Sequence, residues 1–250
     1  MLSPQRVTPR RSNSSPKQSS RLLLASLDVT DRPSIDEAVQ AAAERFGPPD
    51  VLVNNAGYGL LGPLEGLDQQ SLFDQFDTNV FGLVAVTQAI LPLMRTRKRG
   101  VVINISSIGG RIAFPFASAN HATKFAVEGL TESMRFELAA HGIRVKLVEP
   151  GGIKTRFNQS NLWLTHPAHE PASSEFRRMS EGLDANLPGP EKVAGVVYRA
   201  ATDASQRLRY PAAPGPYLLM RSPMPDALWR GLVSTSLRQH ARARSEAVIA

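Results

Sequence analysis

Short apolar runs alternate along the chain with longer stretches in which apolar residues recur at helical spacing. The apolar runs, which predict buried strands, are 22–28, 51–55, 101–106, 143–150 and 207–212. The stretches between and after them, which predict helices, are 34–47, 68–97, 119–141 and 191–204. Because strand and helix alternate, the pattern predicts an α/β fold: a doubly wound parallel sheet with helices on both faces, in three layers.

Three other segments lack this alternation. Residues 1–20 contain six serines, three prolines and no apolar periodicity, which predicts a disordered basic tail. Residues 157–190 hold four prolines and are expected to form a loop. A helical extension is expected over about 215–240, with scattered apolar anchors. Residues 21–250 are therefore predicted to form a single domain behind the tail.

The net charge of +7 resides in the two ends of the chain. Residues 1–21 carry five basic side chains and no acidic one, and residues 221–250 carry five arginines against two acids. The part between them is close to neutral, whereas nucleic-acid-binding proteins concentrate basic charge on a folded face. We therefore expect no nucleic-acid partner.

The chain contains no cysteine. This absence excludes disulfides, thiolate nucleophiles and cysteine-ligated zinc, and it fits a reducing compartment, so a cytoplasmic location is predicted. No run of 18 apolar residues is present, which predicts no transmembrane segment. His166 and His169 are spaced as metal ligands can be, but no cysteine lies near them and the segment is rich in proline, so no metal site is expected.

Small and polar residues follow each of four predicted strands. In open parallel sheets, ligands bind beyond the carboxyl ends of the strands, where glycine lets a ligand approach the backbone closely. These four segments are therefore expected to border one crevice. They are Leu27–Val29, Asn54–Gly57, Ser106–Gly110 and Pro150–Thr155.

Six short motifs lie in these segments and in the long helices, in a fixed order along the chain. They are LDVTD at 27–31, NNAGYG at 54–59, TNVFG at 78–82, INISSIGG at 103–110, ATKFAVEGL at 122–130 and VEPGGIKT at 148–155. Over residues 22–235 the chain resembles the short-chain dehydrogenase/reductase family of the classical type, in particular members similar to 17β-hydroxysteroid and retinol dehydrogenases. The resemblance implies a Rossmann-like fold and an NAD- or NADP-dependent interconversion of a small hydrophobic alcohol and its ketone or aldehyde. It also implies a homo-oligomer formed through the helices at 68–97 and 119–141, and a substrate loop at 157–190.

The resemblance also assigns roles to residues. Ser107 would orient the substrate, Lys124 would hold the nicotinamide ribose, and Asn79 would hold a backbone and water relay. Asp28 would lie near the adenine, and Thr155 would bond the nicotinamide carboxamide. The full set implied to bind cofactor is Asp28, Val29, Asn55, Ala56, Gly57, Lys124, Pro150, Gly151, Ile153 and Thr155.

The chain departs from the family pattern at position 120. The family places its catalytic tyrosine four residues before the lysine, and here Asn120 stands four residues before Lys124. The interval of thirteen residues from Ser107 to Asn120 is the family's usual one, so no shift of register hides a tyrosine. A carboxamide cannot exchange the proton that the reaction requires. His121 is expected to point away from the crevice as a surface histidine, and Tyr58 is a remote candidate for a replacement acid.

A second departure concerns the segment before residue 22. The family begins with a strand, a glycine-rich turn that feeds the pyrophosphate onto a helix N-terminus, and a second strand, but no glycine precedes Gly47 here. In the family order these two strands occupy the centre of the sheet. We therefore expect either that 22–27 pairs directly with 51–55, or that 21–47 is loosely held and the open edge associates with another chain.

Three interpretations stay open at this point. The chain is an oxidoreductase whose activity is impaired by Asn120 and whose hold on NAD or NADP is weakened by the missing turn. Alternatively, it is a non-catalytic relative that binds a ligand or a partner. As a third possibility, the start of the sequence is misassigned and the glycine-rich turn is encoded upstream.

Overall fold

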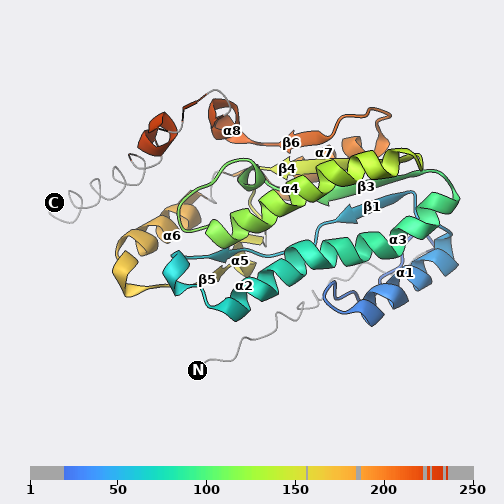
Figure 1. Cartoon of the computed structure of the whole chain (residues 1–250), viewed down its shortest axis with the longest axis horizontal. Helices are drawn as coiled ribbons and strands as arrows, with labels where there is room; N and C mark the ends of the chain where they lie inside the picture. Colours follow the sequence, from blue (N-terminus) through green and yellow to red (C-terminus); the bar gives the residue numbers. More distant parts are fainter. Residues whose placement is uncertain are drawn as a thin grey trace.

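The computed structural model describes residues 20–155, 157–183, 187–221, 224–225, 227–232 and 235. Its main sheet has four parallel strands in the order β1-β3-β4-β6 (Figure 1). Their bounds are Val51–Asn54 for β1, Gly100–Ile105 for β3, Ile143–Pro150 for β4 and Arg209–Ala212 for β6. The predicted α/β class with a parallel sheet and flanking helices is thereby confirmed. The predicted tail lies almost wholly outside the described residues, as does the end of the helical extension.

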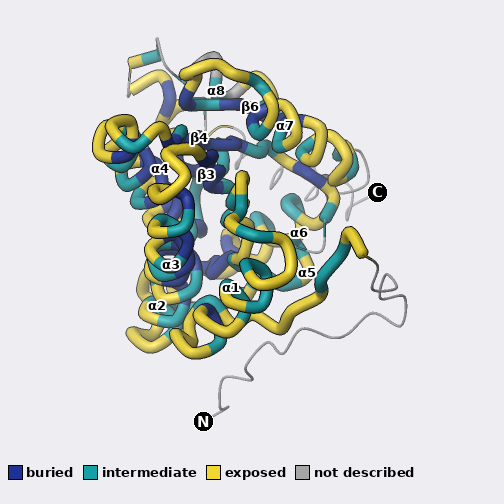
Figure 2. The backbone as a smooth tube through the Cα atoms, turned by 90° about the vertical axis from the view of Figure 1, so that its right-hand side faces the viewer, coloured by how far each residue is buried: buried dark blue, intermediate teal, exposed yellow. Residues whose placement is uncertain are grey.

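Three helices cover one face of the sheet. They are α1 (Arg32–Phe46), α3 (Leu83–Thr96) and α4 (Ser118–Ala139), and their apolar side chains pack on the strand residues that point toward them. Met94 and Leu138, for example, pack against Val102 and Val145. Figure 2 shows the buried strands β3 and β4 between α4 on one side and α7 on the other.

The opposite face is covered only in part. Helix α7 (Pro190–Thr202) packs on Ile103 and Val148 through Val196. In the parallel register Val51 lies beside Val101 and Val53 beside Ile103. The side chains of Val51 and Val53 therefore point to the same face of the sheet as those that contact α7. Val51 and Val53 nevertheless remain 37% and 40% exposed. The face is therefore apolar and open over β1.

The predicted helix at 68–97 is one continuous helical run with a wider turn in its middle. It comprises α2 (Gln69–Phe76), a π-helical segment η2 (Asp77–Gly82) and α3, and it begins at Asp68, whose carboxylate accepts from the Ser71 amide. By length and composition this is the one helix among the described residues that could cross a membrane. Its apolar character has another explanation here, because Ile90 and Met94 belong to the core against the sheet.

The predicted strand at 22–28 is wrong. Apart from an isolated bridge at Leu22, the segment has no strand structure, and Leu24 and Leu27 are 44% and 47% exposed. No described residue supplies a strand beside the free edge of β1, and a lone extended segment has no ladder to satisfy its backbone groups. Of the two expected outcomes, direct pairing of 22–27 with 51–55 is therefore excluded in this structure.

The predicted loop at 157–190 is wrong in part, because much of it is regular. It contains α5 (Phe157–Ser160), β5 (Leu162–Trp163), a short 3₁₀ helix η4 (Pro167–His169) and α6 (Ala172–Leu183). Proline is tolerated at the start of a helix, so Pro167 and Pro171 mark helix starts here rather than a loop. The further elements are β2 (Leu60–Leu61), η1 (Leu64–Gly66), η3 (Ile108–Gly110) and α8 (Gly215–Arg221).

Candidate active site

Lys124 lies on the inner face of α4, against the end of β3. Its ammonium nitrogen donates to the main-chain carbonyl oxygen of Ile105 at 3.1 Å, and the side chain is buried. Burial without a carboxylate partner disfavours the charged form and lowers the pKa of Lys124 to about 8. The structure therefore holds a cation with a shifted pKa against Ile105, which lies two residues before Ser107 in the sequence.

Ser107 joins the ends of β3 and β4. It caps η3 by accepting the Gly109 amide at 3.0 Å, and its hydroxyl donates to the Pro150 carbonyl oxygen over a longer 3.3 Å. The cap fixes the position of the oxygen, while the longer bond is one that a substrate oxygen can replace. The structure thus brings Ser107 and Pro150 together, as the order of the strand ends predicts.

Asn79 connects the loop after β1 to α4. It lies in the π-helical segment, a feature often found at functional sites. Its side-chain oxygen accepts the Tyr58 amide at 3.1 Å, and its nitrogen donates to the Tyr58 carbonyl at 2.9 Å and to the Thr123 hydroxyl at 3.2 Å. A Cβ on Gly57 would come within 2.9 Å of the Asn79 oxygen, so any larger residue here would have to displace the Asn79 side chain.

Asn120 lies in the first turn of α4 with a buried, unsatisfied oxygen. Its main-chain carbonyl accepts the Thr123 hydroxyl at 2.8 Å, but its side-chain oxygen has no hydrogen-bond partner among the described residues. A buried acceptor without a partner costs roughly 1–3 kcal/mol. Thr123, which sequence reasoning missed, thus links Asn79 to Asn120. The sequence feature that could have revealed it is a hydroxyl-bearing residue directly before Lys124.

The prediction that His121 is a surface histidine is wrong. Its ring is buried, Nε2 accepts the Phe114 amide at 3.0 Å, and Nδ1 lies 2.8 Å from the Gly109 carbonyl oxygen. Nδ1 therefore carries the proton and donates it, and burial lowers the pKa of His121. Both ring nitrogens are occupied by backbone groups, so His121 is a positioning residue for the loop after Ser107 and not a proton donor.

Tyr58 is poorly suited to replace the missing acid. Its burial, together with the charges of Asp74 and Asp77, raises the pKa of its phenol to about 12. A phenol with a raised pKa gives up its proton less readily than an ordinary tyrosine, whereas catalytic acids work with pKa values near the working pH.

The residues expected to bind cofactor divide into two groups. The first group is Asn55, Ala56 and Gly57, which follow β1, together with Val29. Asn55 and Ala56 are exposed. Val29 packs closely on Gly82, where an added Cβ would come within 2.7 Å of the valine side chain. These positions lie near Asn79 and remain open. The others hold local bonds: the Thr155 hydroxyl accepts the Phe157 amide at 3.2 Å, and Asp28 accepts the Thr30 amide at 2.9 Å.

The Pro150–Ile153 segment continues from β4. The Gly151 amide donates to the Ala212 carbonyl at 2.9 Å, and Ile153 is buried. Together with Lys124 and the exposed residues Asn55 and Ala56 after β1, this segment fits the nicotinamide and ribose end of a dinucleotide. The pyrophosphate end fits less well, because α1, the first helix in the described part of the chain, has its N-terminus capped by the Asp31 carboxylate, which repels phosphate.

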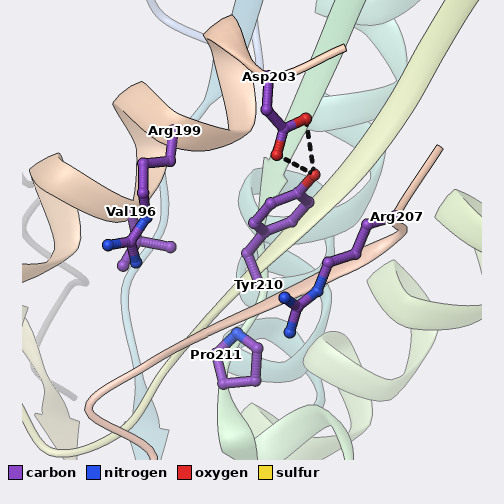
Figure 3. Close-up of a pocket in the computed structure, with 6 residues that line it drawn as sticks. All are labelled: Val196, Arg199, Asp203, Arg207, Tyr210 and Pro211. Atoms are coloured by element: carbon purple, nitrogen blue, oxygen red, sulfur yellow. Dashed lines mark hydrogen bonds between the residues drawn. The ribbon is translucent and has the colours of Figure 1, made fainter. Parts of the chain in front are cut away.

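A pocket of about 270 Å³ lies elsewhere, between α7 and β6 (Figure 3). Within it the Tyr210 hydroxyl donates to the Asp203 carboxylate, which also binds the buried Lys146 ammonium. The loop before β6 places this pocket at the amino end of the strand, away from Ser107 and Lys124. It is lined by Val196, Arg199, Asp203, Arg207, Tyr210 and Pro211.

Comparison with known proteins shows similarity to short-chain dehydrogenases and other oxidoreductases. The short chain dehydrogenase family model matches residues 8–163. An uncharacterized oxidoreductase of Schizosaccharomyces pombe is 38% identical over 212 residues, which cover 82% of this chain and 89% of that protein. Bovine (Bos taurus) retinol dehydrogenase 8 is 37% identical over 198 residues, which cover 75% of this chain and 63% of that protein.

Solved structures agree with these relatives. A short-chain dehydrogenase from Streptomyces avermitilis superposes with a TM-score of 0.70 at 34% identity, covering 87% of this chain and 79% of that one. The protein ElxO with NADP bound superposes with a TM-score of 0.60 at 28% identity, covering 75% and 76% of the two chains.

Proposed function

Because this chain belongs to the short chain dehydrogenase family, a family of NAD(P)-dependent oxidoreductases, we propose that it acts on a hydrophobic alcohol or carbonyl compound and that Asn120 impairs its proton-transfer step. The observation that carries the proposal is the arrangement of Lys124 against Ile105, with Ser107 beside it and the unsatisfied Asn120 oxygen one helical turn before the lysine.

Each of these residues has a distinct task in the proposed reaction. When bound, the nicotinamide cofactor supplies or accepts a hydride. Ser107 donates a hydrogen bond to the substrate oxygen in place of its bond to Pro150. Lys124 places its ammonium at the ribose end of the crevice. Asn120 can bind the substrate oxygen but has no proton to exchange near neutral pH, which slows turnover by roughly 10²–10⁴-fold.

The hydrophobic character of the substrate is supported by the surroundings of the segment after β4. Trp163 and Phe176 pack at 6.4 Å between ring centroids, and Phe176 packs on Phe116 at 5.6 Å. Phe116 lies four residues before Asn120. The name of retinol dehydrogenase 8 points to an apolar alcohol as the substrate of that relative. We also propose a cytoplasmic location, which the absence of cysteine supports.

The first test is a fluorescence titration of the full chain and of Asn120→Tyr with NADPH and NADH, followed by turnover on apolar alcohols and ketones. We expect saturable binding by both proteins and a gain of roughly 10²–10⁴-fold in kcat for Asn120→Tyr. Ser118→Tyr, which adds a phenol at an exposed position of the same turn, is the matched control and should show no gain. Cofactor binding without any gain for Asn120→Tyr contradicts the role given to Asn120.

A second candidate function is a non-catalytic relative that binds a partner. The open apolar face at Val51 and Val53 favours it, as does the edge of β1 that no described residue pairs with. This alternative predicts no saturable binding of either nucleotide up to millimolar concentration. If that is the result, the coding sequence upstream of Met1 distinguishes a true partner-binding protein from one whose glycine-rich turn is encoded there.

A further inference from the structure

We propose that Glu65, His166 and His169 form a binding site for a divalent transition-metal ion of the zinc class. One ligand atom from each residue lies within 4.8 Å of the other two. Nε2 of His169 is 2.6 Å from the Glu65 carboxylate oxygen, and Nδ1 of His166 is 4.0 Å from the same oxygen. Glu65 is 101 residues from His166 in the sequence, so only folding assembles the group.

The backbone segment that carries Glu65 lies close to the backbone segment that carries His166 and His169. Strand β2 pairs with β5 in parallel, and the Leu164 amide extends the pairing by donating to the Leu61 carbonyl at 2.9 Å. A Cβ at Gly62 would overlap the Leu164 carbonyl oxygen, and one at Gly66 would come within 2.7 Å of the Thr165 carbonyl oxygen. Two glycines thus allow the segment that carries Glu65 to lie directly against the segment that carries both histidines.

The ligand chemistry fits zinc better than magnesium or calcium. Two imidazoles and one carboxylate are a common ligand set for Zn²⁺, with a water in the fourth position, whereas Mg²⁺ and Ca²⁺ take mainly oxygen ligands. The His166 Nδ1 lone pair already accepts the Ala168 amide, but at a long 3.3 Å, so a metal ion competes for it with a weak bond. All three side chains are partly exposed and can rotate inward to reach zinc–ligand distances of about 2.0–2.2 Å.

The site has a structural consequence for the neighbouring crevice. The His169 ring packs edge-on against Phe116 at 6.4 Å between centroids, and the Gly62 amide donates to the Phe116 carbonyl at 2.7 Å. A bound ion would therefore tie the segment after β2 and the segment after β5 to the loop that leads into α4. That loop ends three residues before Asn120, so metal binding would fix one wall of the crevice.

The test uses the tag-free full chain, stripped of metal with a chelator and titrated with ZnCl₂ by calorimetry and with CoCl₂ by visible absorption. We expect one ion per chain and, with Co²⁺, the intense visible bands of a four-coordinate site. Glu65→Gln and His169→Ala should each weaken binding at least about tenfold, as the loss of one of three ligands implies. Both positions are at the surface, and circular dichroism checks that the variants fold.

The control is His141→Gln, which removes a histidine outside the cluster and should bind Zn²⁺ as the unmodified chain does. If Glu65→Gln does not fold, His166→Gln takes its place with the same expected loss. The proposal is overturned if the chain binds no Zn²⁺ at millimolar concentration. It is equally overturned if Glu65→Gln and His169→Ala bind the ion as tightly as the His141 control does. In either case, the Glu65–His169 contact is an ordinary surface hydrogen bond.

Discussion

The side-chain nitrogen of Asn79 donates to the hydroxyl of Thr123 at 3.2 Å, which joins the π-helical segment to α4 directly beside Lys124. The same amide holds both main-chain polar groups of Tyr58, so three elements meet at one buried side chain. Lys124 therefore depends on Asn79 for the position of its helix turn. The loop that would contact a cofactor ribose depends on it as well.

Asn79→Ala should lower the free energy of unfolding by about 1–3 kcal/mol, because it leaves the Tyr58 amide without its partner and leaves the Tyr58 carbonyl with only its 3.2 Å bond from Gln75. Urea denaturation measures the loss. Gln40→Ala is the control, since it removes a single exposed side-chain bond to Glu44 and should change stability by no more than about 0.5 kcal/mol. Equal effects of the two substitutions would show that Asn79 does not hold these elements together.

Gly57→Ala should also destabilise the fold, by about 1–3 kcal/mol, because the new methyl group would press on the Asn79 oxygen. Gly129→Ala is the matched change on α4, where no atom lies within 4 Å of an added Cβ. It should stabilise the protein by about 0.5–1 kcal/mol through helix propensity. Thermal unfolding of the two variants should thus shift in opposite directions, and a shared direction would contradict the close approach at Gly57.

The sequence could predict the four strands of the main sheet, but it also predicts a strand at 22–28 that has no neighbouring strand among the described residues. The runs at 22–28 and 51–55 look alike as apolar segments, yet β1 pairs with β3 whereas 22–28 stays exposed. A hydrophobic pattern reports what a segment can bury, and it does not report whether a partner lies beside it. The same limit applies to the prolines of 157–190, whose number suggested a loop, although Pro167 begins η4 and Pro171 directly precedes α6.

The candidate site shows a similar division. Ser107 could be placed at the crevice because it follows a predicted strand, and Lys124 could be placed there because its segment resembles the family motif. His121 could not, since its burial depends on how the loop after Ser107 folds back to offer the Gly109 carbonyl. The contact of Glu65 with His169 depends on two glycines that let distant segments touch, and no local pattern encodes that contact.

Self-association through the two long helices is a further testable expectation. Phe73, Phe81, Phe125 and Phe136 are exposed on α2, η2 and α4. Phe125 and Phe136 are three helical turns apart and share one face of α4. Phe125→Glu should therefore shift the chain toward monomer in sedimentation velocity, because an ionised group buried in an apolar interface is costly.

Tyr198→Glu is the control for this experiment, since Tyr198 is also an exposed aromatic residue but lies on α7, on the other face of the sheet. It should leave the distribution of species unchanged. A chain that is monomeric throughout, or one that dissociates equally with either substitution, would rule out the helical interface.

Lys124 predicts an unusual dependence of stability on pH. Burial lowers its pKa to about 8, whereas a lysine in the unfolded chain has a pKa of about 10.4. Below pH 8 the group is charged in both states, and folding bears the full cost of burying the charge. Between the two values the unfolded state binds more protons, so the contribution of Lys124 to stability rises with pH, by up to about 3 kcal/mol in all.

The measurement is urea denaturation of the wild-type chain and of Lys124→Met across this range of pH. Methionine keeps the apolar length of the side chain without a titrating group, so the difference between the two proteins isolates the lysine. Below pH 8 Lys124→Met should be the more stable protein, and its advantage should shrink steadily as the pH rises toward 10.4. A difference that does not change with pH would mean that Lys124 keeps its ordinary pKa. Burial against Ile105 would then not lower the pKa of the Lys124 ammonium.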